Sequence, residues 1–362
     1  MKTVRRRRKH HCVALLVILS VAISLMVGTI GCDPAPGYLE IRNWHDLYAV
    51  RGNLSGRYLL MNDLDSTTAG YEELAGNAAN HGKGWQPLGS SDDPFTGIFD
   101  GRGYEVSDMF VNRPDDTVIG LFAAVDAGGV IQDIKVVNAD VTGDWAVGGL
   151  IGQNWGYVRN SYSGGTVTGA DCVGGLVGGN AGSVSDSYSA ASVTGHWDVG
   201  GLVGCSDFRG SVTNSYSVGD VTAEWAVGGL VGGNLGGTVA RSYSTGSVTG
   251  DDYVGGLVGD NQGSVSNSYS TSSVTGEWYV GGLVGDNDST GIVTNCHASG
   301  AVIGSSFAGG LVGSNWGTVS NSFWNMETSG VTESDGGSGR TTTAMQNIAT
   351  FTDTTGEALD NP

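Results

Sequence analysis

The chain is poor in positive charge. Its 362 residues include 17 Lys or Arg against 36 Asp or Glu. Six of the basic residues and none of the acidic ones lie in the first 31 positions, so the remainder carries a formal net charge of −25. A surface of this sign repels nucleic acid and anionic lipid headgroups. We therefore exclude nucleic acid as a partner and expect any membrane contact only through an N-terminal lipid anchor.

Residues that commonly catalyse reactions are also scarce. The six His residues stand at positions 10, 11, 45, 81, 196 and 297, and none has the spacing of zinc ligands. There is no G-x-S-x-G motif and no phosphate-binding loop. The sequence therefore predicts a protein that is not an enzyme.

A carbohydrate-active β-helix enzyme remains the alternative. Asp251, Asp252 and Asp260 lie near one repeat, and paired carboxylates hydrolyse glycosides. A solvated acidic turn is the simpler interpretation of these three residues. Weak calcium binding at the acidic turns is the only cofactor left open, although the Asp spacing does not match a recognised calcium loop.

The five Cys residues do not form a disulfide framework. Cys12 and Cys32 belong to the N-terminal segment, which leaves Cys172, Cys205 and Cys296 in the repeats. An odd number at unmatched repeat positions does not predict pairing. Cys172 and Cys205 can pair only if neighbouring coils bring them together, so we expect small, buried or half-buried thiols.

The first 31 residues have the plan of an export signal. A basic start is followed by the apolar run 13–27 and then by Gly28–Cys32, which reads GTIGC. The segment resembles a bacterial lipoprotein signal, which implies lipidation of Cys32. Cleavage of the same bond by ordinary signal peptidase, or an uncleaved anchor over Val13–Ile30, are the alternatives. All three place the body of the protein outside the cytoplasm, anchored by lipid or secreted to the cell surface.

The body of the chain is organised by a short glycine-rich repeat. The sequence VGGLIG begins at Val147, returns as VGGLVG five times, and closes as AGGLVG at Ala308. The second glycine of each copy recurs every 26 to 28 residues, at positions 149, 175, 201, 229, 256, 282 and 310. A fixed period of this length is typical of stacked repeat architectures.

The repeat predicts strands and no helices. Its apolar positions are short β-branched runs broken by Gly, Asn and Asp, without the spacing of a helical face. Each unit reads as three short strands whose faces are buried only when units stack. We therefore predict an all-β fold, a parallel β-helix (β-solenoid) of about eight coils.

Stacking aligns equivalent side chains in columns along the solenoid. A Tyr column runs through positions 162, 188, 216, 243 and 269, and an Asn column runs through 154, 180, 234, 261, 287 and 315. Stacked Asn side chains can bond their equivalents in adjacent coils. These columns need no ligand to explain them.

The expected domain organisation has five parts. Residues 1–31 form the signal, 32–37 a linker, 38–117 an N-terminal cap with the first strands, 118–325 the solenoid, and 326–362 a flexible tail. Within the cap, Asn43 is expected to cap a short helix, and 66–83 is expected to be a surface loop. Residues 100–103 are expected to form a hairpin turn between strand-like runs.

One variable corner is the best functional candidate. Just before each glycine motif, two aligned positions carry an aromatic residue in nearly every coil. The candidate ligand-binding residues are Trp145, Trp197, Trp225, Tyr253, Trp278 and Tyr279. Exposed aromatics at regular spacing can stack on sugar rings or anchor a protein partner. The competing interpretation is that these rings fold over the corner and shield the strands.

The repeats and the segments beside them resemble the GLUG-motif repeat family. The resemblance rests on the G-L-x-G cores, on the flanking N-x-G-x-V-x-N-S-Y-S-x-G-x-V-T-G, and on accompanying segments such as HDLYAVR and FWNMETSG. It implies a secreted or surface-exposed protein similar to adhesin-like proteins and to the non-catalytic parts of immunoglobulin A1 peptidases. The H-E-x-x-H motif of those peptidases is absent here. We therefore expect adhesion or surface display with a glycan or protein partner, or else a purely structural envelope component.

Overall fold

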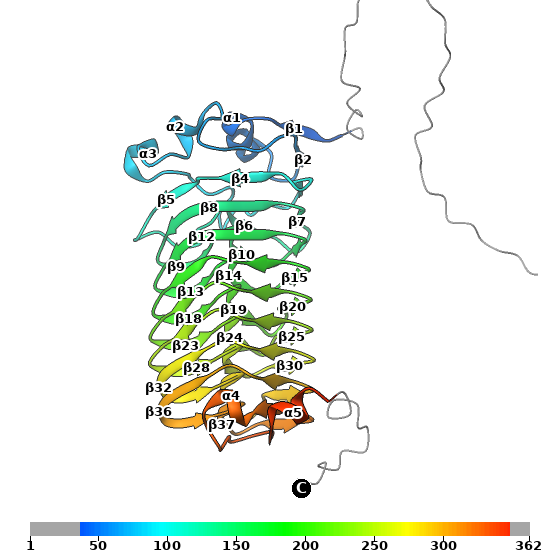
Figure 1. Cartoon of the computed structure of the whole chain (residues 1–362). Coiled ribbons are helices and arrows are strands. Elements are labelled where there is room, and N and C mark those ends of the chain that lie inside the picture. The colour runs from blue at the N-terminus through cyan, green and yellow to red at the C-terminus, as the bar shows by residue number, and fades with distance from the viewer. Residues whose placement is uncertain (1–36, 348–362) are drawn as a thin grey trace, which may run out of the picture. The chain divides into compact units, whose positions relative to one another are not determined.

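A computed structural model of the chain describes residues 37–347. These residues fold into a stack of coils, and the strands of the coils form three sheets that run along the stack (Figure 1). All pairings between the strands of these sheets are parallel, with identical repeat positions opposite each other, such as Val147, Val173 and Val199. The prediction of a parallel β-solenoid is confirmed.

The first sheet has 11 strands and begins in the N-terminal region. Its strands are β1 (Leu39–Ile41), β2 (Arg57–Leu60), β3 (Ile98–Asp100), β7 (Val130–Gln132), β11 (Tyr157–Arg159), β15 (Ser183–Ser185), β20 (Ser211–Thr213), β25 (Thr238–Ala240), β30 (Ser264–Ser266), β34 (Ile292–Thr294) and β38 (Thr318–Ser320).

The second sheet has eight strands. Seven of them begin in the last two residues of a glycine motif, and the first begins in residues 119–122, which read IGLF and are a degenerate copy of that motif. Its strands are β6 (Phe122–Val125), β10 (Ile151–Asn154), β14 (Val177–Asn180), β19 (Val203–Asp207), β24 (Val231–Leu235), β29 (Val258–Asn261), β33 (Val284–Asn287) and β37 (Val312–Asn315).

The third sheet has 21 strands, because most coils contribute two or three short segments to it. Its strands are β4 (Glu105–Ser107), β5 (Phe110–Asn112), β8 (Lys135–Thr142), β9 (Trp145–Gly148), β12 (Tyr162–Thr168), β13 (Asp171–Gly174), β16 (Tyr188–Ser189), β17 (Ser192–Thr194), β18 (Trp197–Gly200), β21 (Tyr216–Ser217), β22 (Val221–Thr222), β23 (Trp225–Gly228), β26 (Tyr243–Ser244), β27 (Val248–Thr249), β28 (Asp252–Gly255), β31 (Tyr269–Ser270), β32 (Val274–Gly281), β35 (His297–Ala298), β36 (Val302–Gly309), β39 (Phe323–Asn325) and β40 (Ser338–Arg340).

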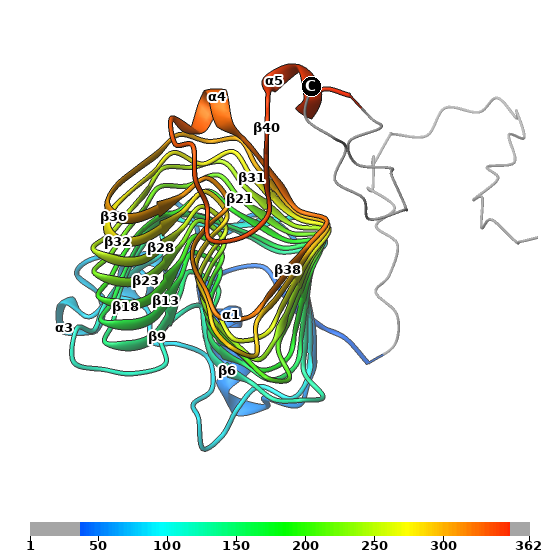
Figure 2. The same ribbon diagram turned by 90° about the horizontal axis from the view of Figure 1, so that it is seen from below.

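The glycine motif lets two strands of one coil pack at backbone distance. A Cβ added to Gly255 would lie 1.8 Å from the carbonyl oxygen of Val258 in the same coil. A Cβ added to Gly259 would lie 2.5 Å from the carbonyl carbon of Ala226 in the preceding coil. Only glycine fits at such a contact. The strands on either side of the motif therefore pack closely against each other. The strands that precede the motif, from β9 to β36, lie in the lobe that projects to one side of the coils in Figure 2.

The core is a set of buried aliphatic columns. The Leu of each glycine motif is fully buried, at positions 150, 176, 202, 230, 257, 283 and 311. The Asn column is buried too, and the Asn261 amide donates to Asn287 Oδ1 at 2.7 Å. Asn154, Asn234 and Asn287 likewise donate to the Asn of the next coil, so most polar groups of the column are satisfied despite their burial.

The N-terminal cap differs in two respects from the sequence expectation. The helix α1 (Trp44–Ala49) is capped by Asn43 as predicted, and the short 3₁₀ helix η1 (Val50–Gly52) follows it. However, residues 66–83 contain α2 (Tyr71–Leu74) and α3 (Ala79–Gly82) instead of only a loop. Residues 100–103 do not close a hairpin, since β3 pairs in the first sheet and β4 in the third. This turn is a solenoid corner.

The C-terminal segment closes the last coil, although the sequence analysis expected a flexible tail from residue 326. Two short helices, α4 (Met326–Ser329) and α5 (Thr342–Met345), are capped by Asn325 and Thr341. Strand β40 pairs with β39, and the Ser334 hydroxyl accepts hydrogen bonds from the last glycine-motif strand. The segment thereby covers an edge that would otherwise offer unpaired backbone groups. Residues 348–362 lie outside the described part of the chain.

A disulfide joins two consecutive coils, which corrects the expectation of unpaired thiols. Cys172 stands at the corner before β14, and Cys205 lies in β19 of the next coil, with 5.1 Å between their Cα atoms. The sequence did not show this because the corner residue of one coil packs on the third residue of a second-sheet strand in the next coil. Asp198 and Gly233 have the same relation one coil further on, since a Cβ on Gly233 would lie 2.4 Å from Asp198 Oδ1. Cys296 is free and buried.

Removing this disulfide should destabilise the solenoid. The bond closes a sequence separation of 33 residues, for which constraint of the unfolded chain accounts for about 3–4 kcal/mol. We expect Cys172→Ser/Cys205→Ser to unfold at a lower denaturant concentration than the wild type. Reductant should lower the unfolding midpoint of the wild type and leave that of the double variant unchanged. Cys296→Ser is the matched control, because the equivalent position is Ser in neighbouring coils. Equal stability of the double variant and the wild type would contradict the assignment.

Candidate functional site

The aromatic corner lies where the third sheet meets the lobe built on the glycine motif. Two columns of residues form it, and their register matches the sequence alignment. The outer column reads Trp145, Asp171, Trp197, Trp225, Asp252, Trp278 and Ser306, and the inner column reads Ala146, Cys172, Asp198, Ala226, Tyr253, Tyr279 and Phe307. The structure therefore gathers all six predicted ligand-binding residues at one corner.

Five of the rings form one continuous path along the solenoid axis. Trp197 stacks on Trp225 with centroids 5.2 Å apart and an interplanar angle of 10°. The path then crosses to the inner column, where Trp225 and Tyr253 are 5.8 Å apart. Tyr253 stacks on Tyr279 at 5.3 Å, and Tyr279 on Phe307 at 5.1 Å. We call Trp197, Trp225, Tyr253, Tyr279 and Phe307 the aromatic path.

The rings are not folded away beneath the corner. Trp197 is 53% exposed, Trp278 is 45% exposed and Phe307 is 59% exposed. Trp225, Tyr253 and Tyr279 are half-buried, because each is covered by the rings above and below it. Trp278 flanks the path at 6.1 Å from Phe307, whereas Trp145 stands apart, next to Asp171. Phe307 was not among the predicted site residues, although it aligns with Tyr253 and Tyr279 in the repeats and could have been identified from that alignment.

The inner column has an unusual backbone. Every residue in it adopts a left-handed conformation with φ between 49° and 53°, including Tyr253, Tyr279 and Phe307. Bulky side chains rarely take this conformation, whereas Asn takes it readily. The other left-handed corner of the coils has Asn at 160, 214, 267, 295 and 321, Asp at 186 and Arg at 241. Rings held at a strained corner indicate a role beyond local backbone preference.

Carboxylates line the same corner. Desolvation by the lobe raises the pKa of Asp198 to about 7, helped by the charges of Asp171 and Asp260. Desolvation likewise raises the pKa of Asp260 to about 6, although Gln262 donates to it at 2.9 Å. Burial also raises the pKa of Asp286, the next residue in that column. The segments that build the corner contain neither Lys nor Arg.

Other residues singled out by the sequence do not assemble into a site. The pKa of Asp252 is raised by burial and then by Asp251 and Glu277, whereas Asp260 responds to Asp286 and Asp288. The charges of Asp252 and Asp260 both raise the pKa of Tyr253, after its burial and the charge of Asp286. Asp171, Cys172 and Asp198 lie close enough for a metal, but the Cys172 sulfur is in the disulfide. Cys32 lies outside the described residues.

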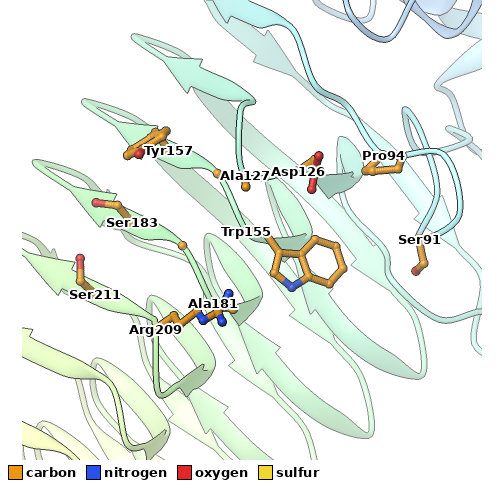
Figure 3. Close-up of a pocket in the computed structure, with 12 residues that line it drawn as sticks. Ser91, Pro94, Asp126, Ala127, Trp155, Tyr157, Ala181, Ser183, Arg209 and Ser211 are labelled. Atoms are coloured by element: carbon orange, nitrogen blue, oxygen red, sulfur yellow. The ribbon is translucent and has the colours of Figure 1, made fainter.

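The sequence analysis missed a second feature, a surface pocket near the N-terminal coils. It has a volume of about 660 Å³ and is lined by Trp155, Asp126 and Arg209 among others (Figure 3). These residues lie on turns between the second and first sheets, away from the aromatic corner. Turns from four successive coils and a loop of the cap build the pocket, so the sequence of a single repeat gave no signal for it.

The elevated pKa of Asp198 predicts that the fold loses stability as pH rises. Because the native state holds this proton to a higher pH than the unfolded chain, stability falls between about pH 4 and pH 7. The shift of the Asp198 pKa from 3.8 to about 7 limits the resulting loss in the free energy of unfolding to at most about 4 kcal/mol. Denaturant unfolding of Asp198→Asn should therefore show a smaller pH dependence and greater stability than the wild type at pH 8. The exposed Asp186→Asn is the control, and parallel pH profiles for Asp198→Asn and the wild type would refute the prediction.

Comparison with known proteins supports the repeat assignment. The family described as the GLUG motif matches residues 143–168, 195–222, 223–249, 250–275 and 276–303. The copies at Val173 and Ala308 lie outside the matched ranges. Halomucin from Haloquadratum walsbyi is 33% identical over 134 residues, which cover 35% of this chain and 1% of halomucin. A protein provisionally named a Gly-rich membrane protein, from Evansella cellulosilytica, is 34% identical over 82 residues, which cover 22% of this chain and 10% of that protein.

One solved structure also matches this chain. It is a proposed immunoglobulin A1 protease from Bacteroides ovatus, 19% identical with a TM-score of 0.46, and the match covers 85% of this chain and 86% of that one. No helix among residues 37–347 is long and apolar enough to cross a bilayer. The chain therefore carries five GLUG-motif repeats, each of which forms one coil of its parallel β-solenoid.

Proposed function

We propose that this chain is a non-catalytic cell-surface repeat protein that binds a neutral glycan along the aromatic path. The observation that carries the proposal is the unbroken series of five rings, spaced 5.1–5.8 Å apart along the solenoid. Because neighbouring rings cover each other's faces, the path offers mainly ring edges to the apolar C–H groups of a sugar. An extended glycan laid along the axis meets one ring in each successive coil.

The charge of the corner selects among glycans. Asp198, Asp260 and Asp286 accept hydrogen bonds from hydroxyl groups when ionised and donate one when protonated. With no Lys or Arg in the segments that build the corner, an anionic polymer meets only repulsion. The ligand favoured by this arrangement is uncharged and rich in hydroxyls. Binding of such a chain without cleavage suits adhesion or surface display.

The names of the relatives and the disulfide support a location outside the cytoplasm. One relative is named a halomucin and another a membrane protein, although this chain spans only 1% and 10% of their lengths. Disulfides form and persist in oxidising compartments, which agrees with the Cys172–Cys205 bond.

We further propose lipid attachment at Cys32. Protein purified from membranes should carry a diacylglyceryl group on Cys32, as mass spectrometry can show. Cys32→Ser should release the protein from the membrane fraction. An unmodified Cys32 in the membrane-bound protein would contradict the lipid anchor.

The left-handed inner column offers a clean test of the aromatic path. Asn at positions 253, 279 and 307 keeps the backbone conformation and removes the rings. Each ring contact contributes about 0.5–1.5 kcal/mol, so Tyr253→Asn/Tyr279→Asn/Phe307→Asn should weaken binding at least about tenfold on a glycan array. Trp197→Ala/Trp225→Ala/Trp278→Ala should do the same from the outer column.

The control for these variants is Ile303→Thr. Ile303 is 64% exposed on β36, and the paired residue of the preceding coil is Thr275, so the change leaves the fold intact. Unaltered neutral-glycan binding by both triple variants would refute the aromatic path. Release of sugar fragments from a polysaccharide panel would refute the non-catalytic assignment.

A further inference from the structure

The pocket near the N-terminal coils has the form of a small-molecule site. Its volume of about 660 Å³ is in the range typical of ligand pockets. Turns from four consecutive coils form one wall, and the loop containing Ser91 and Pro94 forms the other (Figure 3). The pocket therefore lies where the cap meets the first coils.

Trp155 supplies the pocket with an aromatic platform. The same Asn-Trp-Gly sequence recurs at Trp316, which is 78% exposed, whereas Trp155 is 39% exposed because the pocket encloses it. The equivalent residue in the next coil is Ala181, whose small side chain leaves the indole uncovered on that side. Among the described residues, no other aromatic ring stacks on Trp155. Its face is thus open to an occupant.

Opposite charges stand on the two sides of this platform. Asp126 lies toward the cap loop and Arg209 toward the later coils (Figure 3). Arg159 and Arg241, the other two Arg residues of the repeats, donate hydrogen bonds to Gln132 and Asn214. In contrast, Arg209 rests over the ring of Phe208 and makes no ion pair within residues 37–347. Its guanidinium is available to an anion in a protein that is otherwise strongly acidic.

We infer that this pocket binds a saccharide unit that carries a carboxylate, such as a uronic acid. The pyranose ring stacks on Trp155, and the sugar carboxylate accepts hydrogen bonds from Arg209, whose planar fork suits bidentate pairing. Asp126 accepts hydrogen bonds from the hydroxyls at the far end of the sugar. Ser183 and Ser211 add hydroxyl partners along the wall. The site is separate from the aromatic path and selects an anionic ligand, whereas the path selects an uncharged one, so the inference does not depend on the proposed function.

Calorimetric titration of the folded protein with trigalacturonate and with the uncharged galactose trimer tests the inference. The wild type should bind trigalacturonate more tightly than the neutral trimer, and added salt should weaken only the former. Trp155→Ala should weaken binding of trigalacturonate at least tenfold. Arg209→Gln should bring the affinity for trigalacturonate down to that for the neutral trimer, and Arg209→Lys should restore part of the difference.

Matched controls make the outcome decisive. Trp316→Ala removes the same residue type from the same motif, and Arg159→Gln removes an Arg from outside the pocket, so both should bind trigalacturonate like the wild type. The aromatic-path triple variant should also retain this binding. The inference fails if the wild type does not bind trigalacturonate, if Trp155→Ala and Trp316→Ala behave alike, or if Arg209→Gln leaves the affinity unchanged. None of these failures alters the neutral-glycan result.

Discussion

Everything in this solenoid depends on the close backbone contact at the paired glycines. Two strands of each coil lie so near each other that a single methyl group at Gly255 would overlap a carbonyl oxygen. The contact fixes where each coil turns back and holds the buried Leu and Val columns in register. Glycine is therefore kept at these positions by geometry, and variation is confined to residues that the contact leaves at the surface. The corner beside the lobe is such a place.

The aromatic corner shows how parallel register turns a repeated residue position into a continuous aromatic surface. Because successive coils are in parallel register, rings at equivalent positions stack directly, and a path of five rings needs only one suitable residue per coil. The same packing that forms the lobe encloses Asp198 and Asp260, which raises the pKa of both carboxyl groups. Aromatic surface and tunable hydrogen bonding are thus produced by one structural element. The pocket at Trp155 arises differently, from the meeting of the first coils with the cap.

The repeat period was enough to predict the fold, because an in-register stack leaves little freedom once its unit is known. The columns of Tyr, Asn and corner aromatics followed directly from the alignment of the repeats. The Cys172–Cys205 bond did not, because it joins unlike positions of two coils. The pocket at Trp155 and the ordered segment from α4 to α5 also escaped prediction. Both depend on contacts between the repeats and non-repeated segments, for which the sequence has no internal comparison.

The glycine contact is tested most directly by a pair of single-methyl additions. Gly255→Ala places a Cβ 1.8 Å from the Val258 carbonyl oxygen, whereas Gly128→Ala meets nothing within 4 Å. The structure predicts that Gly255→Ala lowers the free energy of unfolding by at least about 2 kcal/mol. Gly128→Ala should change it by less than about 0.5 kcal/mol. Equal effects of the two substitutions in denaturant unfolding would contradict the claim that this backbone contact sets the fold.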